Sequence, residues 1–426
     1  MTLDLDLPKL MDEVQVSPGV RCLLYRASDN PTLAVFGSVR AGTAFEPAAK
    51  QGLAELTTRL LIRGTTKLAA TELADSLESV GAALAFRNNQ DTISFQARTI
   101  STWTERILGI ISGCLISPAI RASDVEKEKE ELITDIRLRE DDTTRRGMKE
   151  LQRLVYPPEH PYRHDRLGTV ESVKNLERTE VKAYVEGRLA HAPVVLAFAG
   201  MFEKQRVLKW AEKTFGMRDE TSADGNNSNF AKFQPRAENK EIVMPHKMQS
   251  DILIGASGVS RTHPDYEKLN LLNTILGELG FMGRLGARVR DKEGLAYSAT
   301  SFLNAASQGG SWIALAGVNP KNVTQAAELM HEELQRVCDE PVGAGELNSA
   351  KQNQIGSALM ELESTEGMAR TSHNLAHFGL GMDYFAKRRE AYERVDPSEL
   401  QIMAQKYLEA SRLSTIVVGP KLRVGD

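Results

Sequence analysis

Two histidines stand four residues apart in the segment His373-Asn-Leu-Ala-His377. On a helix this spacing places both imidazoles on one face, where they can chelate a metal ion. The intervening positions hold no acidic residue. We therefore interpret the pair as helix-face or packing histidines. A second pair, His160 and His164, brackets Pro161 and follows Pro157-Pro158, so its spacing belongs to a loop and indicates a structural role in a turn.

Glycines recur every three residues at Gly277, Gly280, Gly283 and Gly286. A phosphate-binding loop would continue into Gly-Lys-Ser or Gly-Lys-Thr, and no such sequence follows. From the residues alone, the segment is a flexible or tightly packed turn.

A polar stretch divides the chain into halves of similar length. Residues 217–240 are polar, with several Asn, Ser and Asp residues, one Gly and little apolar periodicity, which predicts a linker or long loop. The predicted domains are therefore 1–216 and 241–426.

The two halves have a similar layout, which suggests an internal duplication. Each half combines alternating apolar strands with helical segments, and no glycine-rich nucleotide turn follows a strand. This arrangement favours an α+β fold over a doubly wound dinucleotide fold. The corresponding segments are Thr32–Val39 and Ile252–Gly258, Gly52–Ile62 and Tyr266–Leu279, Ala122–Glu140 and Ala344–Leu362, Thr143–Val155 and Thr365–Phe378, and Val194–Ala199 and Ser414–Val418.

Composition excludes several classes of protein. The net charge of −4 gives no general basic footprint for nucleic acid. No apolar run approaches the roughly 18 residues of a membrane span. The three cysteines form no CxxC pair and no disulfide framework. The first residues lack a basic and apolar signal sequence, so we expect a cytoplasmic protein, with the periplasm left open if a signal was removed.

Three segments of the chain resemble known motifs. The segment Arg290-Asp-Lys-Glu-Gly-Leu-Ala-Tyr297-Ser resembles the signature R-x-K-x-G-L-A-Y-S, the segment from Gly52 to Thr65 resembles G-L-A-H-F-L-E-H-M-L-F-K-G-T, and that from His160 to Thr169 resembles H-P-x-x-x-x-x-x-G-T. In their order along the chain, these motifs resemble those of the M16 peptidases (insulinase/pitrilysin-like, M16B-type). The resemblance implies two homologous α+β domains. Each would have a mainly antiparallel sheet with helices packed on one face, and together they would form half of a clamshell.

The first half departs from the family at its zinc motif. In H-x-x-E-H, two neutral histidines bind zinc and the glutamate activates the bound water. At the matching positions this chain has Glu55, Thr58 and Arg59. The third ligand would fall near Thr134 or Asp135. Because Arg59 is a permanent cation, we expect no metal in this chain, with zinc held by a partner chain.

The second half keeps the other part of the chemistry that the resemblance implies. Arg290 and Tyr297 match a pair that reaches the zinc half in the family. A phenol can stabilise the oxyanion formed on a peptide carbonyl, and a guanidinium can hold a substrate carbonyl or carboxylate. In noncatalytic M16 chains a glycine-rich loop takes part in substrate recognition, which suggests substrate binding at Gly277, Gly280 and Gly283.

The resulting hypothesis is a subunit of a heteromeric zinc metalloendopeptidase that is inactive alone. Its partner would carry H-x-x-E-H, and its substrates would be extended peptides. Two alternatives stay open: a structural or assembly protein with the M16 fold, and a peptide-binding homodimer without proteolysis.

Overall fold

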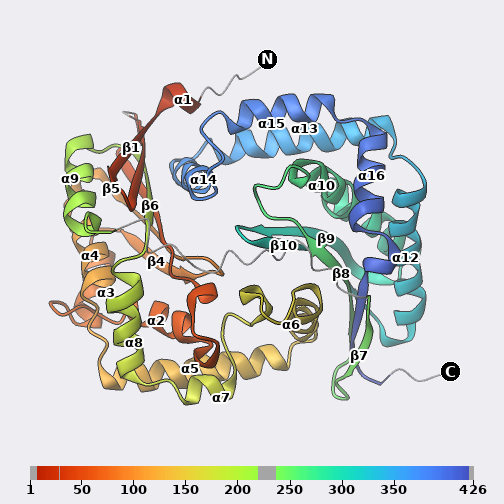
Figure 1. Ribbon diagram of the computed structural model, residues 1–426, viewed down its shortest axis with the longest axis horizontal. Helices are drawn as coiled ribbons and strands as arrows, with labels where there is room; N and C mark the ends of the chain where they lie inside the picture. The colour runs from red at the N-terminus through yellow and green to blue at the C-terminus, as the bar shows by residue number, and fades with distance from the viewer. Residues whose placement is uncertain (1–6, 28, 219–236, 422–426) are drawn as a thin grey trace. The chain divides into compact units, whose positions relative to one another are not determined.

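The computed structural model describes residues 7–27, 29–218 and 237–421, with helices and strands labelled in Figure 1. Most of the predicted linker at 217–240 lies outside the described residues. The chain divides into two compact units, and each draws segments from both halves of the sequence. The first unit comprises Met1–Arg137, His164–Asn227 and Leu359–Ala386, and the second comprises Leu138–Arg163, Ser228–Ala358 and Lys387–Asp426.

The first unit is built on a six-stranded sheet with the order β1-β2-β6-β3-β5-β4. All neighbouring strands are antiparallel except β2 and β6, which are parallel. The strands are β1 Met11–Ser17, β2 Val20–Arg26, β3 Thr32–Val39, β4 Ala83–Asn88, β5 Ile93–Ile100 and β6 Val194–Gly200.

Helices bury both faces of this sheet, whereas the resemblance implied helices on one face only, because α14 from the second half of the chain covers the other face. Alternate residues such as Leu24 and Val35 belong to a large core that includes residues of α2, α4, α5, α8 and α9. Their neighbours Leu23 and Ala34 face the other way and pack with Met368 of α14. The helices are α1 Leu7–Leu10, α2 Leu53–Leu61, α3 Ala70–Glu78, α4 Thr104–Ile116, α5 Ala122–Glu140, α7 Val170–Lys174, α8 Arg178–Tyr184, α9 Lys204–Phe215 and α14 Thr365–His377.

The second unit is built on a five-stranded sheet with the order β7-β11-β8-β10-β9. Strands β7 and β11 are parallel and the remaining pairs are antiparallel. The elements are β7 Asn239–Val243, β8 Ser250–Gly258, β9 Ala296–Ala306, β10 Gly309–Val318, β11 Ser414–Gly419, α6 Thr143–Val155, α10 Tyr266–Asn273, α11 Leu279–Leu285, α12 Val323–Asp339, α13 Ala344–Glu361, α15 Tyr384–Arg394 and α16 Pro397–Tyr407.

Helix α6 packs on β8 and β11 of this second sheet. Glycine permits the close approach on both sides of the contact. A Cβ added at Gly147 would lie 2.3 Å from Leu253, and one added at Gly255 would lie 2.5 Å from Leu151. Core residues Ile252 and Ile254 belong to the opposite face, in a cluster with residues of α12 and α16.

Two equivalent helices are thus exchanged between the halves of the chain. Helix α6 comes from the first half and packs on the second sheet, and α14 comes from the second half and packs on the first. The strands of each sheet, by contrast, all come from one half. This reciprocal arrangement agrees with the inferred duplication. The domain boundaries at 216 and 241 stay a prediction.

The α+β class predicted from the sequence is confirmed, and the expected strand Thr32–Val39 coincides with β3. The segment Tyr266–Leu279 contains α10 and then a short π-helix over Thr274–Glu278. Its regular α-helix is therefore shorter than expected. Within the described residues, no helix is both long and apolar enough to cross a membrane. The three cysteines are free and buried.

The histidines His373 and His377 are packing residues of α14, as expected, and their rings stack on each other. His373 is 3% exposed and its Nε2 lies 2.7 Å from the Ser38 hydroxyl in β3. Burial lowers the pKa of His373 to about 3, so the ring is neutral at physiological pH.

Candidate functional site

Helix α2 carries the positions that would bind zinc in the family, and a half-buried carboxylate, that of Glu46, holds its first turn. Gly52 precedes the helix with φ of 92°, a conformation that favours glycine. Glu46 accepts hydrogen bonds from the backbone nitrogens of Ala54 (2.5 Å) and Gly52 (3.2 Å), two of the unpaired groups at a helix start. Burial raises the pKa of Glu46 to about 8, although both hydrogen bonds favour the charged form.

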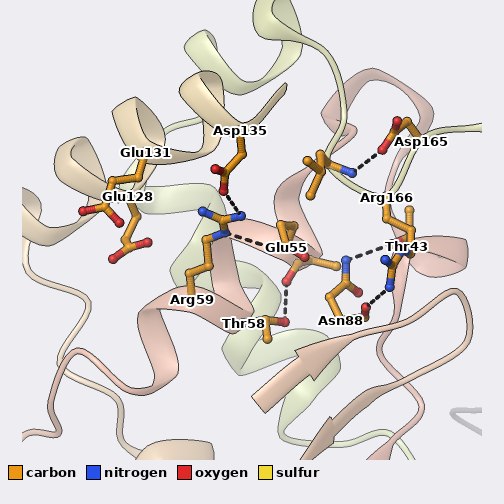
Figure 2. A network of polar contacts seen from close by, with 12 residues as sticks. Thr43, Glu55, Thr58, Arg59, Asn88, Glu128, Glu131, Asp135, Asp165 and Arg166 are labelled. Carbon is orange, nitrogen blue, oxygen red and sulfur yellow. Dashed lines mark hydrogen bonds and ion pairs between the residues drawn. The ribbon is translucent and has the colours of Figure 1, made fainter. Parts of the chain in front are cut away.

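The side chain of Arg59 bridges the two neighbouring ligand positions (Figure 2). Its Nε donates to Glu55 at 2.8 Å, and its Nη2 donates to Asp135 of α5 at 2.7 Å. Burial of Arg59 opposes its charge, but the hydrogen bonds and charges of Glu55 and Asp135 outweigh burial and raise its pKa. The guanidinium therefore holds α2 to α5 through two carboxylates.

Thr134 and Asp135, the two candidates for the third ligand position, differ in their contacts. Asp135 contacts the motif helix, whereas the Thr134 hydroxyl donates to the carbonyl of Glu130 within its own helix. Thr58, at the position of the catalytic glutamate, is buried and donates to the carbonyl of Ala54.

A second arginine, two residues beyond the C-terminal end of α2, also pairs with carboxylates of α5. Arg63 pairs with the buried Glu128 and, at 3.3 Å, with Glu131. The α5 carboxylates that face these arginines, those of Glu128, Glu131 and Asp135, are therefore each paired with a guanidinium.

These side chains do not fit a zinc ion. A structural or catalytic zinc site needs three or four histidine, cysteine or carboxylate ligands around an open centre. The described residues include no group of three such side chains that could hold a metal ion. Between Glu55 and Asp135 lies a cation that cannot lose its proton.

The second candidate set lies in the other unit. Tyr297 is 80% exposed, and in the part of the chain that the structure describes its hydroxyl has no hydrogen-bond partner. The ladder between β9 and β10 pairs Ala296 with Val318 and Ser298 with Gly317, so Tyr297 is the extra residue of a β-bulge. Bulges are frequent beside active sites, where they redirect a side chain. Strand β9 is also an edge of its sheet.

Arg290 lies in the short π-helix Gly286–Lys292, and about a third of its side chain is exposed. Its guanidinium stacks over the ring of Phe281 at 4.4 Å and lies 3.4 Å from the carboxylate of Asp291. Among the described residues, Arg290 and Tyr297 share no hydrogen bond or ring contact. The partner that the structure brings to Arg290 is therefore Phe281.

The three predicted glycines differ in their surroundings. A Cβ at Gly277 would lie 2.1 Å from the backbone nitrogen of Ser301, and one at Gly283 would lie 2.5 Å from that of Gly277. Close packing therefore requires glycine at both Gly277 and Gly283. Gly280 has φ of 64° and open space around it. Two residues further on, Met282 has φ of 77°, which is strained for a bulky residue.

Comparisons with known proteins agree with the motifs. Residues 23–153 match the family described as insulinase (peptidase family M16), and residues 175–354 match the peptidase M16 inactive domain. The chain belongs to peptidase family M16. The first match contains the Glu55, Thr58 and Arg59 positions, and the second contains Arg290 and Tyr297.

Relatives within M16 include zinc proteases. An uncharacterized zinc protease of Streptomyces coelicolor is 25% identical over 91% of this chain and 85% of its own. The mitochondrial-processing peptidase subunit beta of Neurospora crassa is 26% identical over 78% of this chain and 71% of its own. The crystal structure of a peptidase M16 inactive domain from Pseudomonas fluorescens shares the fold, with a TM-score of 0.88 and 20% sequence identity. The match covers 98% of this chain and 100% of the Pseudomonas chain.

Three features of these two sites were not predicted from the sequence. Glu46 caps the motif helix from a position six residues ahead of Gly52, the bulge singles out Tyr297, and Phe281 supports Arg290. Only Phe281 left a signal in the sequence, as a large aromatic residue between two glycines.

We expect the purified M16 chain to hold no stoichiometric zinc when measured by plasma mass spectrometry, because Arg59 occupies the space between the carboxylates. The R59H variant should also lack zinc, since one histidine does not complete a ligand set. The triple variant E55H/T58E/R59H restores the motif beside Asp135 and should gain zinc. Tight zinc binding by the wild-type chain would contradict this prediction.

A second prediction concerns pH. Because the pKa of Glu46 is raised to about 8 from 4.5, the folded protein binds more protons than the unfolded chain between these values. The free energy of unfolding should therefore fall as pH rises through this window. His331, His373 and His377, whose pKa values are lowered by burial, act oppositely around pH 6.5, so a comparison of wild type with E46Q in thermal melts at pH 6.5 and 8.5 isolates Glu46. The E46Q variant should lose less stability than wild type across that interval; equal losses would refute the assignment.

Proposed function

We propose that this chain is the zinc-free member of a two-chain M16 metalloendopeptidase. A partner chain carries H-x-x-E-H and the zinc ion, and this chain contributes Arg290 and Tyr297 to the same active site. The observation that carries the proposal is the contrast between a zinc position filled by Arg59 and an exposed Tyr297 on a bulge, whose hydroxyl has no partner in the described part of the chain.

The role of Tyr297 follows from its environment. A phenol without a partner among the described residues can donate its proton to a substrate oxygen without first breaking another hydrogen bond. A donor aimed at the developing oxyanion lowers the barrier because the bond is stronger in the transition state than in the ground state. The bulge provides a physical reason for the side chain to leave the regular alternation of β9.

The surroundings of Tyr297 suit an extended peptide. Strand β9 is a sheet edge, and its outer backbone groups can pair with an added strand. Arg290 offers guanidinium donors to a substrate carbonyl or carboxylate, while Phe281 fixes its plane by stacking. The exposed Phe281 and the strained Met282 belong to the Gly277–Gly283 segment, where we place further substrate contacts.

The assembly is consistent with the relatives, one of which is named as the beta subunit of a processing peptidase. In this chain Thr58 replaces the glutamate that activates water in the motif, and the nearby carboxylates of Glu55 and Asp135 are both paired with Arg59. Isolated chain should therefore show no peptidase activity.

The decisive experiment is to isolate the native chain from its source cells and identify co-purifying proteins by mass. We expect a stoichiometric second M16 chain with an intact H-x-x-E-H, and peptide cleavage by the pair that neither chain shows alone. Recovery of homo-oligomers only, or of an unrelated assembly without peptidase activity, would replace the proposal by a peptide-binding or structural role.

A further inference from the structure

A cavity of about 570 Å³ lies within the second unit, and neither Arg290 nor Tyr297 lines it. Its walls come from the ends of β8 and β10, the segment that follows α6, and the C-terminal end of α16. This volume falls within the roughly 300–1,000 Å³ typical of small-molecule sites.

Hydrogen bonds make part of this cavity a fixed structure. The Nδ1 atom of His160 accepts a hydrogen bond from the backbone nitrogen of Tyr162 at 3.0 Å. The ring proton is therefore on Nε2, which donates to the carbonyl of Gln308 at 3.3 Å. The backbone nitrogen of Gln308 in turn donates to the Tyr162 hydroxyl at 3.2 Å. The turn before β10 is thus tied to the segment after α6 without a ligand.

The cationic groups of the cavity are not equally available. Lys406 lies 2.6 Å from the carboxylate of Asp265, which also accepts a hydrogen bond from the Tyr407 hydroxyl at 2.6 Å. The charge of Lys406 is therefore already matched. His263 accepts the backbone N–H of Asp265 on Nδ1 at 3.1 Å, which leaves a neutral ring with its proton on Nε2.

Arg412 is the cation without a match. Across the described residues, its guanidinium has no hydrogen bond and no ion pair, and its Nε is buried without a partner. Buried donors in folded proteins are nearly always satisfied, by the protein, by water or by a bound group. A guanidinium presents two parallel N–H groups that match the two oxygens of a carboxylate.

We propose that this cavity binds a small organic monocarboxylate, with its two oxygens on Arg412. One unmatched positive charge favours a singly charged carboxylate over a phosphate dianion. Part of the remaining wall is apolar or aromatic, with Val155, Tyr156, Pro157 and Tyr407, and the rest is polar, with Ser257, Ser260 and Gln308. The ligand therefore has an apolar or aromatic body, as in an acylated amino acid or the last residue of a peptide.

The test uses the full chain and isothermal titration calorimetry with N-acetyl-L-phenylalanine. We expect one saturable site, and binding weaker by about tenfold or more for the corresponding amide, which lacks the charge. R412Q should weaken acid binding to the same degree, while R412K, which keeps the charge but not the fork, should lie between. The matched control is R394Q, because Arg394 is 81% exposed, pairs with Glu390 and does not line the cavity.

Peptides identify the source of the carboxylate. A pentapeptide ending in a free phenylalanine should bind as well as the single residue if the site takes peptide C-termini, and worse if it takes free acids; either result supports a carboxylate site. The proposal is overturned if no acid binds saturably, if R412Q binds as wild type does, or if inorganic phosphate alone binds. Since binding is measured on the isolated chain, failure of the two-chain peptidase would not affect this result.

Discussion

Tyr297→Phe is expected to lower kcat of the reconstituted two-chain peptidase by about two to three orders of magnitude, with assembly unchanged. The substitution removes one hydroxyl and keeps the ring. Since Tyr297 is exposed and its hydroxyl has no partner among the described residues, removal of the hydroxyl should not change the stability of this chain. The cost should fall on the step in which the oxyanion forms, so KM should change little.

The measurement is steady-state cleavage of a fluorogenic peptide, with the complex checked by analytical ultracentrifugation. Tyr25→Phe is the matched control, because Tyr25 of β2 also has no described hydroxyl partner and packs in the core of the other unit. An unchanged rate for Tyr297→Phe would remove this residue from the mechanism. A complex that falls apart would instead assign Tyr297 to a subunit contact.

Gly277→Ala is expected to destabilise the chain by roughly 3 kcal/mol or more. Its new Cβ would lie 2.1 Å from the backbone nitrogen and 2.3 Å from the hydroxyl of Ser301. Backbone at this position cannot move easily, because the Gly277 carbonyl accepts a hydrogen bond from Thr300 at 2.7 Å. Relief of the clash would have to shift the segment that carries Phe281 away from β9.

Urea denaturation of the isolated chain measures this effect. Gly356→Ala in α13 is the control, because no atom lies within 4 Å of its added Cβ and alanine is the better helix former. That variant should be as stable as wild type or more stable, by up to about 1 kcal/mol. Similar stability of Gly277→Ala and wild type would show that the contact with β9 relaxes at little cost.

The two predictions test different properties of one region. Tyr297 is proposed to act on the substrate, and its removal should be silent in stability. Gly277 is proposed to hold the loop against β9, and its substitution should act first on stability and then on any substrate contact made through Phe281.

The sequence by itself determined the local elements and the chemistry that is absent. Strand and helix periodicity located β3 and α2 to within a residue, because alternation and helical spacing are properties of consecutive residues. The replacement of two histidines and a glutamate by Glu55, Thr58 and Arg59 needs no structure to exclude the usual zinc ligand set. The sequence motifs alone also indicated membership of the M16 family.

The tertiary structure decided what depends on residues far apart in the chain. Arg59 meets Asp135 only because α5 packs beside α2, and an alignment uncertain by one residue could not choose between Asp135 and Thr134. The exchange of α6 and α14 could not be predicted either, since an amphipathic helix specifies a buried face but not the sheet that covers it. The bulge at Tyr297 and the unmatched charge of Arg412 likewise follow from strand register and packing, which no short stretch of sequence encodes.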